Sequence, residues 1–252
     1  MTEHPCRRAR QQRGISLIVV MVMLLLGTIL VLGATRTNWL NESLVNNESD
    51  YQRAYSAAEA LMADAETDIR GTLVGLVPCR AGAGFDGCRN RAGGRPFFPM
   101  SSAGTDLDEL ETNMGGQLCR EGICWTPNYT DGALGVAWWN DPARVTAMTA
   151  AGVPATYGQF TLANQGGAGN SDNPLLRVRG NGAFGGWYWV EVMEYNIAAG
   201  AMGAGSVPNV PIPADTQPFV YRITVMVNGL KPGTRVVLRS VFVPNVSNTA
   251  LP

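Results

Sequence analysis

The sequence predicts an α+β protein in which one long N-terminal helix, half membrane-spanning and half amphipathic, packs on a C-terminal antiparallel sheet. An uncharged apolar run over residues 15–34 continues into a helical pattern that reaches residue 70. Three segments rich in β-branched and aromatic residues lie within residues 186–243 and alternate as strands do. Between them, residues 72–173 are dense in turn formers and predict a variable loop region of a globular domain, residues 72–252.

The apolar run predicts a membrane-spanning helix. Residues 15–34 contain no charged side chain, and as a helix rising about 1.5 Å per residue they can cross a hydrocarbon core of about 30 Å. Four arginines precede the run, and Arg36 is the nearest cation behind it. Because a cationic flank stays in the cytoplasm, we expect a single-pass protein whose C-terminal part lies on the other side of the membrane.

The stretch after the membrane segment predicts an amphipathic half of the same helix. Apolar side chains recur there at spacings of three, four and seven, so one face is expected to pack on the sheet. Gly71, with Pro78 soon after, predicts the end of the helix. The apolar positions are Leu40, Leu44, Tyr51, Tyr55, Ala58, Met62, Ala65 and Ile69, with Glu42, Glu48, Asp50, Glu59, Asp64 and Glu66 expected largely on the other faces.

The C-terminal third predicts three strands, over residues 186–195, 219–227 and 235–243. Asn-Gly and Pro-Gly pairs between the last two strands predict a hairpin. Within the variable loop region, residues 106–118 and 142–151 each predict a short helix, the second with proline at its first position.

Composition excludes several classes of function. The chain has 19 Lys and Arg against 20 Asp and Glu, so its net charge does not favour nucleic acid. Its one histidine, His4, precedes the apolar run, which leaves the globular domain without the usual base of a nucleophilic pair. The carboxylates within residues 106–111 are expected to stabilise the N-terminus of a helix through its dipole, which is a structural role. We therefore predict no enzyme, no cofactor and no metal site.

The junction at the start of the apolar run resembles the cleavage signal of type IV pilins and pseudopilins. A basic stretch ends in Arg13 and Gly14, and the helix opens with the sequence Ile-Ser-Leu-Ile from Ile15. In that family, prepilin peptidase cuts after the glycine and the new N-terminal residue is methylated. The resemblance implies a prepilin leader over residues 1–14, cleavage between Gly14 and Ile15, and N-methylation of Ile15.

Val19 departs from the usual pilin pattern. Most pilins carry glutamate five residues after the cut, where it is thought to pair with the N-terminal amine of a neighbouring subunit. A buried carboxylate is costly without such a partner, so Val19 suggests a subunit that does not dock under another in the usual way. The same departure is found in PilX-type minor pilins and in K-type pseudopilins, where it accompanies a place at or near the filament tip.

Five further stretches resemble PilX-type minor pilins. Two lie in the N-terminal region, over residues 36–43 and 51–61. Three are strand-like, the YWVE sequence at 188–191, YRIT at 221–224 and TRVVLRS at 234–240. The resemblance implies a type IV pilin-like fold, with the long helix packed on the sheet.

Four cysteines remain once Cys6 is removed with the leader, an even set that allows three pairings. A zinc site competes with disulfides, but the spacings are not those of paired zinc knuckles. We favour two disulfides because each closes a short glycine-containing loop, and a local Cys-x4-Cys loop also resembles PilX-type sequences. The favoured pairs are Cys79 with Cys88 and Cys119 with Cys124.

The function implied by the resemblance is structural. We expect a minor pilin that helps to initiate type IV pilus assembly and sits at or near the pilus tip, supporting twitching motility and adhesion. Its expected partners are other minor pilins, the major pilin, a pilus-tip adhesin, prepilin peptidase and the bacterial inner membrane, from which it passes to the pilus and cell surface. One alternative is a K-type pseudopilin of type II secretion, although its usual large helical insertion and calcium site are not evident. A second is a signal-anchored periplasmic binding domain that keeps its leader.

Overall fold

The computed structural model describes residues 15–73, 77–78, 89, 94–99, 105–125, 134–135, 137–163, 173–177, 185–195, 213–214 and 217–244. The chain is α+β and divides into two compact units, Met1–Ser49 and Asp50–Pro252, the second of which we call the globular unit. The expected leader with Gly14, and both Cys79 and Cys88, lie outside the described residues.

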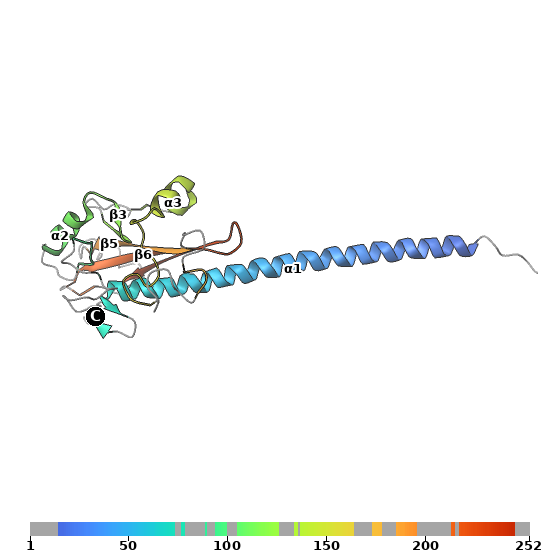
Figure 1. The fold of residues 1–252 in the computed structure, drawn as a ribbon, viewed down its shortest axis with the longest axis horizontal. Helices are drawn as coiled ribbons and strands as arrows, with labels where there is room; N and C mark the ends of the chain where they lie inside the picture. Colours follow the sequence, from blue (N-terminus) through green and yellow to red (C-terminus); the bar gives the residue numbers. More distant parts are fainter. Residues whose placement is uncertain are drawn as a thin grey trace, which may run out of the picture. The chain divides into compact units, whose positions relative to one another are not determined.

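The long helix predicted from the N-terminal pattern is present. Helix α1 spans Ile15–Ile69, a run of 55 residues coloured blue to cyan in Figure 1. It ends where the sequence indicates, because Gly71 takes a left-handed conformation with a φ of 64° and its amide donates to the Asp68 carbonyl at 2.9 Å.

Three long antiparallel strands make up most of the main sheet, as predicted. They are β5 (Gly186–Glu194), β6 (Phe219–Asn228) and β7 (Arg235–Phe242), paired in that order. A separate pair of two-residue strands, β1 (Thr72–Leu73) and β2 (Val77–Pro78), follows α1.

The main sheet is mixed, which differs from the antiparallel sheet that we expected. The loop region adds a short hairpin of β3 (Cys119–Arg120) and β4 (Ile123–Cys124), which gives the order β3-β4-β5-β6-β7. Strand β4 runs parallel to β5, with Ile123 opposite Val190. The pairing is possible because the Gly122 carbonyl in the hairpin turn accepts the Val190 amide at 2.6 Å.

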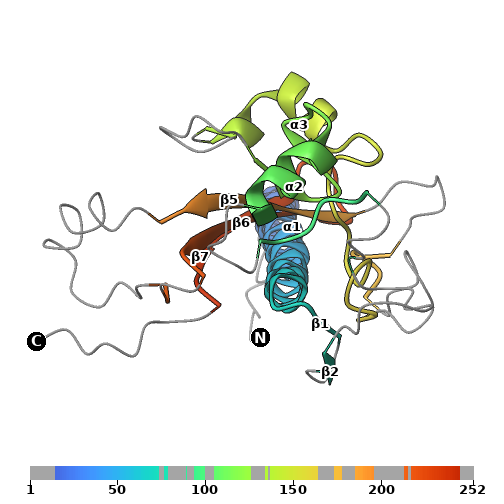
Figure 2. The ribbon, with the colours of Figure 1, turned by 90° about the vertical axis from the view of Figure 1, so that its left-hand side faces the viewer.

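Both faces of the sheet in the globular unit are covered. On one face Tyr188, Val190 and Val192 pack with the buried side of α1, and on the other Trp187 and Trp189 form a second cluster. The second cluster is closed by the 3-10 helix η2 (Trp138–Asn140) and by α3 (Pro142–Met148). Figure 2 shows α3 on the side of the strands opposite to α1.

The two short helices predicted in the loop region are present. Helix α2 (Thr105–Met114) ends earlier than predicted because Gly115 and Gly116 take φ values of 58° and 76°, which a helix does not allow. Helix α3 begins as predicted at Pro142, and the Asp141 side chain accepts the Ala143 amide at 2.9 Å.

The buried face of α1 differs from the predicted one. Asp50 and Asp64, expected on polar faces, are each only 4% exposed, whereas Tyr51, expected on the apolar face, is 45% exposed. The prediction for these three residues is wrong because loops of the globular unit supply hydrogen-bond donors to the carboxylates, so that those carboxylates face the core. The buried apolar residues of this helix are Ala54, Ala57, Ala58, Leu61, Ala65 and Ile69.

Candidate functional site

The first candidate site is the apolar segment of α1 in the unit Met1–Ser49. Among the described residues, α1 is the one helix long and apolar enough to cross a membrane, and none of its most apolar window is buried in the protein. Leu17 and Leu30 are 79% and 73% exposed. Because such a surface needs lipid or other apolar chains around it, the helix indicates membrane anchoring, as in a pilin.

The predicted processing residues lie at the start of this segment. Ile15 is the first residue of α1, and Val19 follows one turn later with 45% of its surface exposed. The Val19 side chain is apolar, so this position carries no charge.

The disulfide expected in the loop region is present between Cys119 and Cys124. The two sulfur atoms lie 2.06 Å apart and join the neighbouring strands β3 and β4, in which the two cysteines are paired across the hairpin. Both cysteines belong to the cluster on the α3 side of the sheet. The bond therefore closes the β3–β4 hairpin, and the β4–β5 pairing attaches that hairpin to the sheet.

A buried ion pair joins α1 to the loop region in the globular unit. The Arg89 guanidinium donates from Nε to both Asp68 oxygens, at 2.9 and 3.0 Å, and from Nη2 to Oδ2 at 2.7 Å. The side chains are 5% and 2% exposed. Arg89 Nη2 also donates to the Glu121 carbonyl at 2.8 Å, so one side chain holds α1 and the β3–β4 turn together.

Aromatic rings enclose this pair. The Arg89 guanidinium lies 3.8 Å from the Phe160 ring centroid and 5.0 Å from that of Phe98. The Tyr188 hydroxyl donates to Asp68 Oδ2 at 2.8 Å. Burial lowers the pKa of Arg89, but the Asp68 charge, the hydrogen bonds to Asp68 and the nearby Tyr188 and Glu121 together raise it more, so the net shift is upward. Burial and the Asp68 charge raise the pKa of Tyr188.

Asp64 lies one helical turn before Asp68 and has no basic partner among the described residues. Its Oδ2 accepts the Gly158 amide at 2.8 Å, and its Oδ1 accepts the Thr161 hydroxyl. Burial, with the Asp68 charge as a smaller contribution, raises the pKa of Asp64 to about 7. This carboxyl group therefore titrates near neutral pH and fixes the 156–163 loop on α1.

A third carboxylate of α1 fixes the β6–β7 hairpin. Asp50 accepts the Leu230 amide at 3.0 Å and the Lys231 amide at 3.1 Å. Burial raises its pKa, but these two amides and further polar contacts lower it more, so the net shift is downward. Gly229 is required beside it, because a Cβ there would lie 2.4 Å from Asp50 Oδ2.

The sequence did not lead us to predict these three contacts between aspartates of α1 and the loops. The aspartates themselves nevertheless follow a pattern that could have been recognised. Asp50, Asp64 and Asp68 continue the spacing of four and three residues that also contains Ala54, Ala57 and Leu61. Reading the carboxylates as part of the periodic face, instead of as solvated charges, gives the buried side of α1. Arg89 carries no comparable signal.

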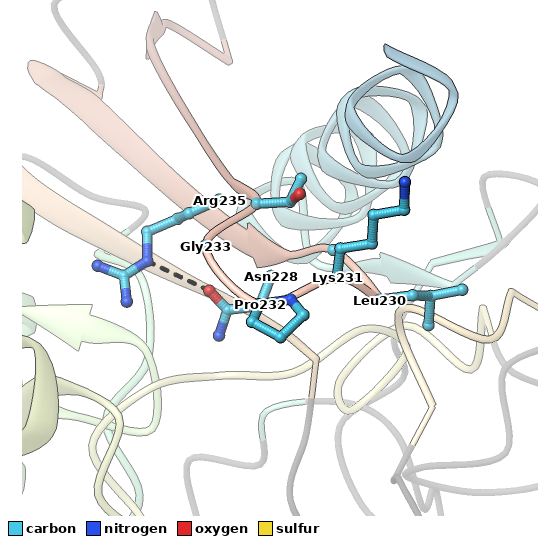
Figure 3. A pocket seen from close by; sticks show the side chains of 8 residues that line it. Asn228, Leu230, Lys231, Pro232, Gly233 and Arg235 are labelled. Carbon is cyan, nitrogen blue, oxygen red and sulfur yellow. Dashed lines mark hydrogen bonds between the residues drawn. The ribbon is translucent and has the colours of Figure 1, made fainter. Parts of the chain in front are cut away.

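The hairpin loop between β6 and β7 lines a pocket of about 460 Å³. Its walls are eight consecutive residues, from Asn228 to Arg235. In Figure 3, Arg235 lies on one side of the loop, where its Nε bonds Asn228 Oδ1 at 3.2 Å, and Lys231 lies on the other. The pocket contains no nucleophile with a base beside it and no group of metal ligands, so it does not indicate catalysis among the described residues.

The described residues thus form a membrane-type helix and an α+β unit, which is the pilin-like fold class expected from the sequence. Residues 13–63 match the family model described as PilX N-terminal, and residues 86–244 match the one described as type IV pilus assembly protein PilX C-term. Since the second match alone covers more than half of the chain, the protein belongs to the PilX family of type IV pilus assembly proteins. No curated protein and no solved structure matches it.

Family membership makes the chain a minor pilin of type IV pilus assembly, a structural protein that acts with other pilus proteins. The fold class and family expected from the sequence are thereby confirmed.

Proposed function

We propose that this minor pilin helps to initiate type IV pilus assembly and remains at or near the pilus tip, in a complex with other minor pilins. The observation that carries the proposal is Val19, an apolar residue within the exposed apolar segment of α1, where most pilins have glutamate. Without that carboxylate the subunit has nothing to offer the N-terminal amine of a subunit above it, so it does not need to dock under another subunit. A subunit of this kind is suited to begin a filament instead of extending it.

The proposal includes a maturation step. Prepilin peptidase cuts between Gly14 and Ile15, the new N-terminus is methylated, and the C-terminal part lies in the periplasm before the protein reaches the pilus. The Arg13-Gly14-Ile15 junction supports this step, because it stands directly before the uncharged apolar run of residues 15–34. The same apolar segment then serves first as the membrane anchor and afterwards as packing surface in the filament.

The first test is the mass of the N-terminal peptide, measured on protein from native membranes and from sheared filaments. We expect methylated Ile15 in both fractions, and a Gly14→Val variant that is not cut and does not support piliation or twitching. A leader that persists on wild-type protein would instead support a signal-anchored periplasmic domain. A deletion that abolishes enzyme secretion and leaves pili intact would support a K-type pseudopilin.

A second test addresses the place in the filament. Val19→Glu restores the usual pilin carboxylate, so we expect more copies per filament in the sheared fraction, measured against the major pilin by quantitative mass spectrometry. Val19→Leu is the matched control, because it stays apolar and should leave the copy number unchanged. An equal copy number for Val19→Glu and Val19→Leu would contradict the role given to this position.

The proposed partners are other minor pilins, the major pilin and a tip adhesin, and the proposed roles in adhesion and twitching follow from assembly.

A further inference from the structure

Strand β7 forms one edge of the five-stranded sheet. The strand order ends in β6-β7, and among the residues that the structure describes β7 pairs with β6 alone. The opposite edge is occupied by the β3–β4 hairpin, whose strands have two residues each. With eight residues, β7 is the long edge available to another strand.

The register identifies the backbone groups that point away from the sheet. The Asn228 amide donates to the Gly185 carbonyl, so the even-numbered residues of β6 bond to β5 and the odd-numbered ones to β7. Because Val225 pairs with Leu238, the even-numbered residues of β7 are those that bond β6. The outward N–H and C=O groups therefore belong to Arg235, Val237, Arg239 and Val241.

Two of these residues have open backbone groups within the described structure. No described residue bonds the outward groups of Val237 or Val241, and the Val241 side chain is 59% exposed. Edge strands of natural proteins are commonly guarded by charged side chains, bulges or proline. From Arg235 to Phe242, β7 contains no proline and pairs with β6 without a bulge.

The two arginines of β7 do not guard the edge, because they are held over the sheet face. Arg239 donates to Thr224 Oγ1 at 3.2 Å, and its guanidinium lies 4.7 Å from the centroid of the Trp139 ring. Arg235 is bonded to Asn228, as Figure 3 shows. Both contacts keep the guanidinium groups on the sheet face, so they carry positive charge there without covering the outward backbone groups.

Charge indicates what kind of strand this edge fits. Residues 216–252 contain no Asp or Glu and four cations. Arg222 is paired with Glu191 and Lys231 lies beside Asp50, so Arg235 and Arg239 supply the positive charge of β7. An incoming strand would place its side chains opposite those of β7 on the same face, where unlike charges attract and like charges repel. A second copy of β7 would bring two more arginines, four in all with no acid on that face, so pairing between two copies is disfavoured.

We propose that the β7 edge binds an extended acidic segment of a partner pilus protein as a sixth strand. On the face that carries Arg235 and Arg239, the segment would alternate acidic residues with apolar residues that lie opposite Val237 and Val241. Backbone hydrogen bonds to the outward groups provide affinity, and the alternation provides specificity. The proposal rests on the assembly role proposed above for the class of partner.

The test uses the full chain in detergent micelles and a labelled seven-residue peptide. Valine and glutamate alternate at its odd positions, and threonine fills the even positions. Its matched control has lysine in place of glutamate. By fluorescence anisotropy we expect the glutamate peptide to bind at least tenfold more tightly than the lysine peptide, and added salt to reduce the difference.

A protein variant tests the edge itself. Val241→Pro removes an outward N–H that β6 does not use, so the sheet should keep its melting temperature while peptide binding falls at least tenfold. Val241→Thr keeps the N–H and should bind as the wild type does.

Equal binding of the two peptides, equal binding by Val241→Pro and Val241→Thr, or no binding at all would overturn the proposal. A dimer of the full chain that the glutamate peptide does not dissociate would also overturn it, in favour of pairing between copies. Failure here is distinguishable from failure of the proposed function, because the mature N-terminus and the sheared fraction are measured without the peptide.

Discussion

Arg89 satisfies more than one buried group of the globular unit. It neutralises Asp68 and also bonds the Glu121 carbonyl, with both side chains of the ion pair almost fully enclosed. Breaking a buried pair from one side leaves an uncompensated charge, which costs about 3–5 kcal/mol. We therefore expect Arg89→Met to lower the free energy of unfolding by about that amount, measured by urea titration of the detergent-solubilised chain.

Two further variants test whether the uncompensated charge of Asp68 causes this loss of stability. Adding Asp68→Asn to Arg89→Met removes the lone carboxylate and should restore part of the stability, whereas simple loss of packing predicts no recovery. Arg95 is the matched control: its side chain is 53% exposed and its Nε lies 3.6 Å from Glu121, so Arg95→Met should cost less than about 1 kcal/mol.

Asp64 makes stability depend on pH. Its pKa of about 7 in the fold lies above the ordinary value near 3.8, so the folded state binds an extra proton between these values. The contribution is fully present below about pH 4 and is lost as the pH rises through 7, by an amount of up to about 4 kcal/mol. Protonation here stabilises the fold, in contrast to a salt-bridged carboxylate.

Asp64→Asn is expected to reduce the decrease in the free energy of unfolding between pH 4 and pH 8, because the amide does not ionise. The measurement is the urea midpoint of the full chain across that pH range. Glu59→Gln, on an exposed position of the same helix, should leave the slope as in the wild type. An unchanged slope for Asp64→Asn would show that the pH dependence arises elsewhere.

At the scale of the element, the β3–β4 turn depends on Gly122. Its φ is 82°, and a Cβ there would lie 2.5 Å from the Ala155 Cβ. Gly152 has a φ of 80° with no atom within 4 Å of the corresponding position. We expect Gly152→Ala to cost about 1 kcal/mol from backbone strain, and Gly122→Ala to cost at least twice as much in urea unfolding.

Comparing the two glycine variants separates the cost of backbone strain from the cost of the contact with Ala155. If Gly122→Ala costs no more than Gly152→Ala, the close approach of the hairpin to Ala155 does not matter for stability. If the excess is found, hydrogen exchange should show it at the Val190 amide, which bonds the Gly122 carbonyl.

Elements with a strong local pattern could be predicted from the sequence. Strands β6 and β7 alternate and are joined by a turn with Asn228-Gly229, so their bounds agreed with prediction to within a residue or two. The two-residue strands β3 and β4 have no period to detect, and the parallel pairing with β5 depends on contacts across 67 positions, from Ile123 to Val190. Arg89 was missed for a related reason, since its partner Asp68 lies 21 residues away.

At the scale of the whole molecule, the apolar segment of α1 should decide where the protein resides. Leu25→Arg places a charge near the middle of the run, at a cost of about 2.5–3.5 kcal/mol for insertion. We expect a smaller share of the protein in the membrane pellet after an alkaline wash. Leu44→Arg, an exposed position beyond the run, should be retained like the wild type, and equal retention of both variants would contradict membrane anchoring by this segment.

The position of the long strands along the chain has a consequence for biosynthesis. All three long strands lie after residue 185, whereas the helix face and the hairpin that they cover lie before residue 125. While the chain is being made, Ala54 to Ile69 therefore have no sheet to pack against until the ribosome has completed β6 and β7. For most of its synthesis the nascent chain therefore has three aspartates and an apolar helix face uncovered. We expect chaperones in the compartment where folding occurs to bind this face.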